Sequence, residues 1–194
     1  MNNYWDTQWE KRIHKDGSVS GNSQKVEFLV KQIWMRPHLI KAIKLDVGCG
    51  PCTIARHLEN VCPGWSKDYL GVDTSSVAVV DALNHGINAI ESSIYSFVAE
   101  TTIEYDAFFF FDVLEHMEDH DKIAKKVIKL GAEKYTILLN VPLYQSYPET
   151  PDGYERLVDV NLMTKFLNKA GIRKVIQHVY GINGYPYLFM EGVT

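Results

Sequence analysis

The most constraining feature of the sequence is a glycine turn between an apolar strand and an amphipathic helix. The turn reads Val-Gly-Cys-Gly-Pro-Cys at residues 47–52, and the apolar run at residues 43–47 predicts a buried strand before it. Its two glycines let the backbone lie close to a ligand, because no Cβ intervenes. Pro51 suits the first position of a helix, which we expect at residues 51–60. A second apolar run ends at Asp73, so the segment predicts a βαβ unit that binds a ligand where the helix starts.

Two details of this unit favour one kind of ligand. A dinucleotide site prefers a third glycine where this chain has Thr53, and the carboxylate of Asp46 would repel a diphosphate. An acid at that position instead suits a ligand with a positive charge, such as the amino group of a methionine moiety. Residues 43–73 resemble motifs I and II of the class I S-adenosylmethionine-dependent methyltransferases, and the resemblance extends over about residues 40–192.

The resemblance implies a cofactor site. It implies that Asp46, Gly48 and Gly50 border the methionine part of the cofactor and that Asp73 holds its ribose. Serines after the third predicted strand would bond the adenine through hydroxyl or backbone groups, although simple solvation of these serines is the alternative. The full set of predicted cofactor residues is Asp46, Gly48, Cys49, Gly50, Asp73, Thr74, Ser92, Ser93, Phe111 and Asp112.

Cys49 and Cys52 also form a C-x-x-C pair, which is the redox motif of thioredoxin-like proteins. That class usually has an aromatic residue before the first cysteine, where this chain has Gly48. Cys52 also stands where many methyltransferases have a third glycine. A redox pair should contain one thiol of strongly lowered pKa. In the methyltransferase interpretation the turn serves backbone approach, and we expect no catalytic disulfide.

Composition sets broader limits. The 194 residues suit one domain, and we expect an N-terminal lid and helix segment at residues 1–40 ahead of a core at residues 41–194. No apolar run approaches the length of a membrane span, and no secretory signal is visible. Three cysteines make no disulfide framework, so the cytoplasm is the expected location. A net charge of −4 argues mildly against a nucleic-acid partner, and nothing indicates the oligomeric state.

The order of predicted elements indicates an α/β fold. Strands and helices alternate, which implies a parallel sheet covered by helices on both faces. Asn183-Gly184 between the last two strands predicts a tight antiparallel hairpin. The resemblance implies a Rossmann-like, seven-stranded, mostly parallel sheet that ends in such a hairpin. The predicted strands are residues 43–47, 69–72, 87–91, 105–111, 135–141, 174–180 and 187–191, and the predicted helices are residues 24–36, 51–60, 75–85, 93–100, a segment ending at 131, and 160–169.

A second cluster follows the fourth predicted strand. If the chain turns helical at Asp112, then Asp112, Glu115 and His116 share one face, because they are related by i, i+3 and i+4. Two carboxylates and an imidazole suit Mg²⁺ or Mn²⁺. A metal-free role for His116 as general base is an equal alternative. A third is a purely structural role at the start of a helix.

This acid-x-x-Glu-His pattern is similar to two metal-dependent groups of methyltransferases. One group comprises the O-methyltransferases of ubiquinone biosynthesis, and Val-Leu-Glu-His is common in small-molecule methyltransferases. The other methylates the terminal ribose 2′-hydroxyl of small RNAs, but it needs a later histidine that residues 140–158 lack. Both groups typically carry Glu where this chain has Asp112.

The predicted function is methyl transfer from S-adenosylmethionine, with Mg²⁺ or Mn²⁺ as a candidate second cofactor, to a hydroxyl of a small-molecule acceptor. Aromatic residues are the candidate substrate contacts, in the loop after the fifth predicted strand and near the N-terminus. Two alternatives stay open besides the redox protein: methylation of an RNA terminal ribose, and a cofactor-binding protein without catalysis. The candidate substrate residues are Tyr144, Tyr147, Tyr154, Trp5 and Trp9.

Overall fold

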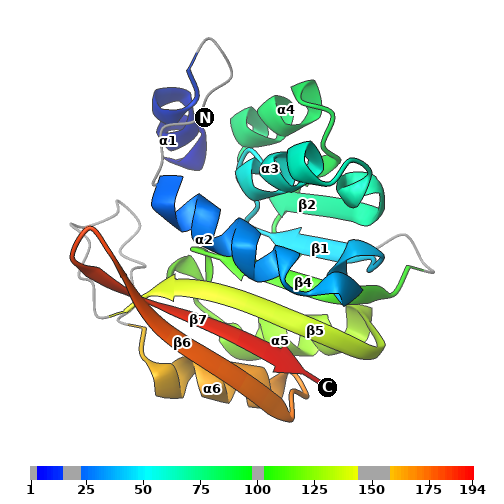
Figure 1. Cartoon of the computed structure of the whole chain (residues 1–194), viewed down its shortest axis with the longest axis vertical. Coiled ribbons are helices and arrows are strands. Elements are labelled where there is room, and N and C mark those ends of the chain that lie inside the picture. Colours follow the sequence, from blue (N-terminus) through cyan, green and yellow to red (C-terminus); the bar gives the residue numbers. More distant parts are fainter. Residues whose placement is uncertain (1–3, 15–22, 98–102, 144–157) are drawn as a thin grey trace. The chain divides into compact units, whose positions relative to one another are not determined.

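The computed structural model describes residues 4–14, 23–97, 103–143 and 158–194, which fall into two compact units divided after Phe97. The described residues contain seven strands of a mixed, mostly parallel sheet (Figure 1). This architecture confirms the predicted fold class. The predicted division into a segment at residues 1–40 and a core at residues 41–194 stays a prediction.

The first unit is built on three parallel strands in the order β3-β2-β1. All four residues of β1 are buried, and Asp46 in β1 lies opposite Gly71 in β2. Its strands are β1 (Lys44–Val47), β2 (Tyr69–Asp73) and β3 (Ala89–Glu91), and its helices are α1 (Tyr4–Arg12), α2 (Ser23–Trp34), η1 (Pro37–Ile40), α3 (Thr53–Val61), η2 (Trp65–Asp68) and α4 (Ser76–Asn84).

Two predicted helices of this unit were wrong in part. Helix α3 begins at Thr53 rather than at Pro51, because Gly50 (φ 53°) and Cys52 (φ 54°) both adopt left-handed backbone conformations that a right-handed helix cannot contain. No helix forms in the described part of residues 93–100, where residues 94–96 make a turn. The hydroxyl of Ser93 accepts a hydrogen bond from the backbone N–H of Ser96 at 3.2 Å, a local bond that competes with helix formation.

The second unit contains four strands in the order β4-β5-β7-β6. Strand β4 pairs with β5 in parallel, whereas β7 is antiparallel to both β5 and β6. The predicted hairpin is confirmed: its turn residues Asn183 (φ 51°) and Gly184 (φ 82°) both have positive φ, as a type I′ turn requires. The elements are β4 (Tyr105–Phe111), η3 (Leu114–His116), α5 (His120–Leu130), β5 (Gly131–Pro142), α6 (Val160–Lys169), β6 (Lys174–Ile182) and β7 (Tyr185–Val193).

Aspartates begin the two long helices of the second unit. The side chain of Asp119 accepts from the N–H of Lys122 at the start of α5, and that of Asp159 accepts from the N–H of Leu162 at the start of α6. Such N-caps satisfy backbone donors that have no partner within the helix. Helices α5 and α6 pack against each other. The caps therefore help to set the residue at which each helix begins.

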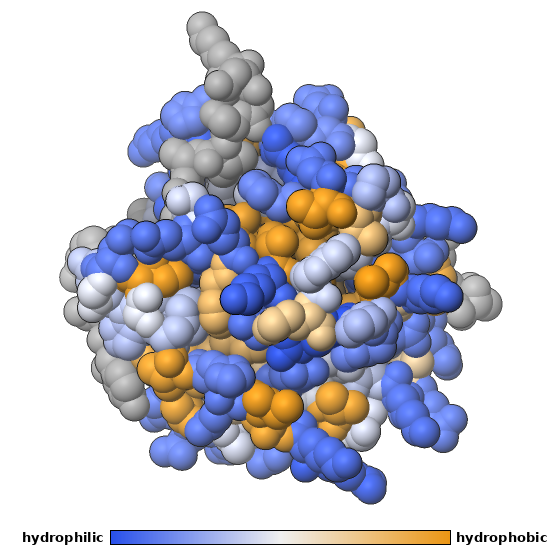
Figure 2. All heavy atoms as spheres, in the orientation of Figure 1, coloured by the Kyte–Doolittle hydropathy of each residue, from blue (hydrophilic) through white to orange (hydrophobic). Residues whose placement is uncertain are grey.

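Among the helices of the described residues, none is long and apolar enough to cross a membrane. Figure 2 shows a face on which apolar side chains are interspersed with hydrophilic ones.

Candidate active site

The turn after β1 is shaped by its glycines. Gly48 has φ 68° and its N–H donates to the carbonyl of Val72 in β2 at 2.8 Å, so the turn is tied to the neighbouring strand. Gly50 is held under the side chain of Trp9 from α1. A Cβ added to Gly50 would lie 2.5 Å from Cζ2 of that indole, which leaves no room for any other residue. The group that lies close to Gly50 in this structure is the indole of Trp9, and close approach of a ligand to the turn stays a prediction.

Asp73, at the end of β2, is fixed by the backbone of both neighbouring loops. Its Oδ2 accepts from the N–H of Gly50 at 2.8 Å, and its Oδ1 accepts from the N–H of Ser75 at 2.9 Å. Burial raises the pKa of this carboxyl, and hydrogen bonds from Ser75, Gly50 and Thr74 oppose that rise. Each carboxylate oxygen has a second lone pair, so Asp73 keeps acceptor capacity for the hydroxyls of a ribose.

Asp46 is the second acid of the first unit and is only 5% exposed. The phenol of Tyr69 donates to its Oδ2 at 2.8 Å. Burial raises the pKa of Asp46 to about 7, the hydrogen bond from Tyr69 opposes the rise, and the charge of Asp73 adds to it. A buried acid whose charge is costly is one that a ligand cation would stabilise.

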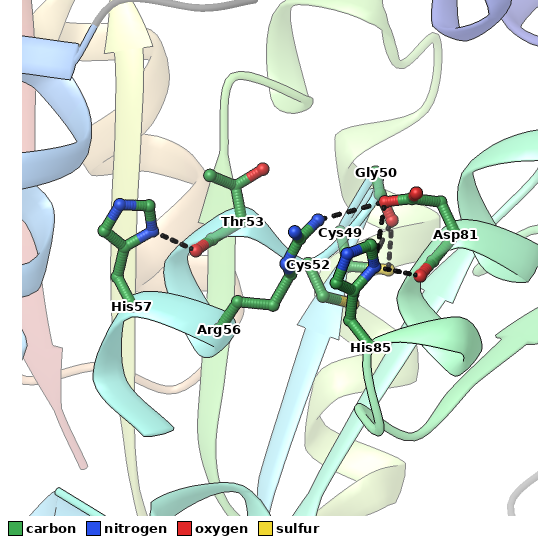
Figure 3. Close-up of polar contacts among 8 residues, drawn as sticks. All are labelled: Cys49, Gly50, Cys52, Thr53, Arg56, His57, Asp81 and His85. Atoms are coloured by element: carbon green, nitrogen blue, oxygen red, sulfur yellow. Dashed lines mark hydrogen bonds and ion pairs between the residues drawn. The ribbon is translucent and has the colours of Figure 1, made fainter. Parts of the chain in front are cut away.

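The two cysteines of the turn face Gly71 in β2. A Cβ on Gly71 would lie 2.6 Å from Sγ of Cys49 and 2.8 Å from Sγ of Cys52, so both thiols occupy the space that a side chain there would need. Figure 3 shows both sulfur atoms directed to the carbonyl oxygen of Gly50, at 3.3 and 3.9 Å. The Cys52 thiol, burial and nearby carboxylates raise the pKa of the Cys49 thiol well above its ordinary value. A redox nucleophile requires the opposite shift.

Side chains also tie the start of α3 to α4. Arg56 donates to Oδ2 of Asp81 at 3.0 Å, and Nδ1 of His85 lies 3.6 Å from the same oxygen (Figure 3). The helix that follows the glycine turn and the helix that follows Asp73 are thus linked by an ion pair. This linkage holds the two loops of the site in a fixed relation.

The residues predicted to bind adenine make hydrogen bonds within the protein. The N–H of Ser92 donates to the carbonyl of Asp73 at 2.8 Å, and the hydroxyl of Ser93 lies 3.0 Å from that of Ser96. The serines therefore shape the turn after β3. Adenine binding by Ser92 and Ser93 stays a prediction.

In the second unit, Asp112 directly follows β4 and has a strained conformation. It has φ 54°, unusual for a residue other than glycine, and such strain concentrates at functional sites. Its Oδ1 accepts from Nδ2 of Asn140 at 2.9 Å, and the hydroxyl of Tyr180 donates to Oδ1 of Asn140. Asn140 and Tyr180 are not among the site residues predicted from the sequence. Asn140 could have been noticed as a lone asparagine within the apolar run of β5, whereas no feature of the sequence marks Tyr180.

The expected helical face of Asp112, Glu115 and His116 was wrong. The left-handed backbone at Asp112 breaks the helix, and only the three-residue η3 follows, so the three positions do not share a face. Glu115 is buried and its Oε1 lies 3.9 Å from Nε2 of the partly exposed His116. Among the residues with described positions, no three His, Cys, Asp or Glu side chains form a group able to hold a metal ion. The three residues predicted to bind Mg²⁺ or Mn²⁺ therefore do not form such a group.

The other predicted contacts divide between the described residues and the rest of the chain. Trp9 contacts Gly50, as noted, while Trp5 makes an edge-to-face contact with Tyr4 at 5.1 Å between ring centroids. Phe111 stacks on Phe109 at 5.5 Å. The candidate substrate residues Tyr144, Tyr147 and Tyr154 lie outside the described residues.

The residues of the first unit fit a ligand with an amino group and a ribose. Asp46 and Asp73 are acceptors, which suit an ammonium and a pair of hydroxyls, and they would repel a diphosphate at the same place. Gly48 and Gly50 supply backbone with no Cβ beside it. Acids combined with a glycine turn therefore favour S-adenosylmethionine over a dinucleotide.

Known proteins support this assignment. Residues 45–132 match a family model described as "Methyltransferase domain". No curated protein sequence matches the chain. Magnesium protoporphyrin IX methyltransferase from Synechocystis PCC 6803, with bound SAH, has a similar structure with a TM-score of 0.74 and 17% identity, and the similarity covers 98% of this chain and 95% of that one.

Two further solved structures are similar. The plantazolicin methyltransferase BpumL has a TM-score of 0.67 at 12% identity, covering 97% of this chain and 88% of its own. The N-methyltransferase NodS from Bradyrhizobium japonicum has a TM-score of 0.61 at 15% identity, covering 87% of this chain and 97% of its own. The names of these relatives indicate chemically different acceptors, so the fold does not specify one.

The match of residues 45–132 to a methyltransferase domain model, together with the fold shared with S-adenosylmethionine-dependent methyltransferases, agrees with the resemblance inferred from residues 43–73. The narrower likeness to the ubiquinone-biosynthesis enzymes stays a prediction.

Proposed function

We propose that the protein binds S-adenosylmethionine through its first unit and transfers the methyl group to an oxygen atom of a small molecule. One observation carries the cofactor part of this proposal. Asp73 is held through both carboxylate oxygens by N–H groups of Gly50 and Ser75, from two different loops. A carboxylate fixed in this way is ready to accept hydrogen bonds from a ribose diol without further ordering.

Asp46 supports the choice of cofactor. Its burial makes an unpaired charge costly, and an ammonium group beside it would offset that cost. S-adenosylmethionine, when bound, supplies a methyl group that a nucleophile can take in an in-line displacement. The residues of the first unit therefore bind and orient, and orientation accounts for much of the acceleration in such a reaction.

The choice of oxygen as the acceptor atom comes from the residues after β4. His116 is the candidate base, because its imidazole is partly exposed and Glu115 lies 3.9 Å away. Nε2 of His116 would take the proton of the acceptor hydroxyl as the oxygen is methylated, and the carboxylate would stabilise the imidazolium that forms. Asp112, held by Asn140, would orient the acceptor.

The test is a search for the acceptor with isotope-labelled S-adenosylmethionine. The protein is incubated separately with a small-molecule extract and with total RNA, and the products that gain the label are identified by mass spectrometry. Label in a small-molecule ether or ester supports the proposal. Label only at an RNA terminal ribose would replace it with the RNA alternative, and cofactor binding without any labelled product would indicate a binding protein that lacks catalysis.

A matched pair of variants makes this test specific. His116→Ala should abolish most of the labelling while leaving cofactor affinity unchanged, whereas Asp73→Ala should weaken cofactor binding. If His116→Ala labels the acceptor at the normal rate, His116 is not the base and the role falls to other groups.

A further inference from the structure

Helix α1 contacts the loops of the candidate cofactor site at two points. Asp6 and Trp9 are three residues apart, so they lie on one face of this nine-residue helix. α1 packs against α4 (Figure 1). Asp6 is only 9% exposed, although a carboxylate in the first turn of a short helix is ordinarily solvated.

The carboxylate of Asp6 is held by donors at the start of α4. Its Oδ1 accepts from the hydroxyl of Ser75 at 2.7 Å, the hydroxyl of Ser76 at 3.4 Å and the N–H of Val77 at 3.3 Å. The hydroxyl of Ser75 in turn accepts from the N–H of Ala78 at 3.2 Å as the N-cap of α4. A negative charge at a helix N-terminus is favourable, so Asp6 acts as a second cap supplied by another helix.

Trp9 makes the other contact, at the glycine turn. The closeness of its ring to the position of a Cβ on Gly50 shows that the indole edge touches the backbone there. Any rotation of α1 would therefore move the ring against the turn or away from it.

Two of the residues that α1 contacts also donate hydrogen bonds to Asp73. Gly50, beneath Trp9, donates its N–H to Oδ2 of Asp73 at 2.8 Å. Ser75, bonded to Asp6, donates its N–H to Oδ1 of Asp73 at 2.9 Å. One helix thus contacts two of the residues whose N–H groups orient Asp73.

From this geometry we infer that Asp6 is a positioning residue for the cofactor's ribose, which acts through Ser75 on Asp73. The inference rests on the proposed function and extends it to a residue far from the glycine turn in sequence. Breaking the Asp6 contact would let α1 and the Ser75 backbone move, and the hydrogen bond from Ser75 to Asp73 would be weakened. Cofactor affinity should then depend on a residue that does not touch the cofactor.

The experiment is a double-mutant cycle with S-adenosylhomocysteine as the probe. Calorimetry measures its dissociation constant for the wild type, Asp6→Asn, Asp73→Asn and the double variant. We expect Asp6→Asn alone to weaken binding about tenfold, in line with the loss of charged hydrogen bonds. In the Asp73→Asn background the same change should cost less than about twofold, because residues that act through one another are not additive.

Glu10→Gln is the matched control, since it removes the same charge from an exposed position on the same helix. It should leave the dissociation constant unchanged. Thermal unfolding is followed for every variant. If Asp6→Asn is unfolded at the assay temperature, Trp9→Phe takes its place, because it keeps an aromatic residue but withdraws the ring edge from Gly50, and it should weaken binding several-fold.

Three outcomes would overturn the inference. One is wild-type affinity in a folded Asp6→Asn protein, and another is full additivity of the two substitutions. Both would leave the proposed function standing. Failure of the wild type to bind S-adenosylhomocysteine would instead overturn the proposed function, and the inference with it.

Discussion

The ionisation of Asp46 should control how cofactor affinity depends on pH. Burial raises the pKa of this carboxyl to about 7 in the free protein. If Asp46 pairs with the amino group of the cofactor, only its ionised form binds well. Between about pH 6 and about pH 7.5 the ionised fraction of such a group rises roughly eightfold, so the affinity for S-adenosylhomocysteine should rise by about the same factor.

The hydrogen bond from Tyr69 gives this prediction a specific perturbation. The phenol donates to Oδ2 of Asp46 at 2.8 Å and lowers its pKa against the effect of burial. Tyr69→Phe should therefore raise the pKa further and shift the whole affinity curve to higher pH. Asp46→Asn should bind weakly at every pH, with no slope over this range. Tyr185→Phe, at a phenol that is 56% exposed in β7, is the control and should leave the curve in place.

The raised pKa of Asp46 also makes the stability of the folded protein depend on pH. The pKa of Asp46 in the folded protein lies above its ordinary value of 3.8, so the folded state binds the proton more tightly than the unfolded chain. This stabilisation is complete below the unfolded pKa and is lost as pH rises through the folded pKa of about 7. Denaturant unfolding of Asp46→Asn should lack that loss of stability.

If the affinity of the wild type for S-adenosylhomocysteine is flat or falls with rising pH, the assignment of Asp46 is refuted.

Four other perturbations have defined outcomes. Gly71→Ala should destabilise the protein by about 1–3 kcal/mol, because its Cβ would meet the thiols of Cys49 and Cys52, and thermal unfolding measures the loss. Replacing Cys49 and Cys52 together by Ser should leave methyl transfer largely intact in a turnover assay, since the turn acts through its backbone. A strong chelator should not change the rate, because the left-handed backbone at Asp112 keeps the three predicted ligands from sharing a helical face. His116→Ala should slow transfer about a hundredfold or more. Loss of activity with the chelator and its return with Mg²⁺ would restore the metal hypothesis.

Much of the fold could be predicted because its signals are local. The apolar run Tyr105–Phe111 and the segment Val160–Lys169 match β4 and α6 at both ends, and Asn183-Gly184 marks the hairpin turn. Periodicity and turn preferences depend on neighbours in sequence, so these elements needed no knowledge of the tertiary structure.

The errors arose where backbone conformation departs from the preference of the residue. Cys52 and Asp112 both adopt positive φ, which few residues other than glycine do, and each ends or delays a helix that the sequence predicted. The residue type alone therefore carries little signal for such conformations.

The candidate site depends on long-range contacts more than the helices and strands do. The glycine turn and Asp73 could be recognised because their spacing along the chain is characteristic. The contact of Asp6 with Ser75 joins residues 69 positions apart, and that of Tyr180 with Asn140 joins residues 40 positions apart. Hydrogen bonds of this kind follow from the fold, and no local pattern predicts them.

The most direct test of the central claim is a calorimetric titration of the wild type and Asp73→Ala with S-adenosylhomocysteine, compared with NAD. The wild type should bind S-adenosylhomocysteine with a dissociation constant in the micromolar range and NAD more weakly. Asp73→Ala should lose at least about tenfold in affinity, or about 1.4 kcal/mol, because the ribose acceptor is gone. Tighter binding of NAD, or unchanged affinity in Asp73→Ala, would contradict the account.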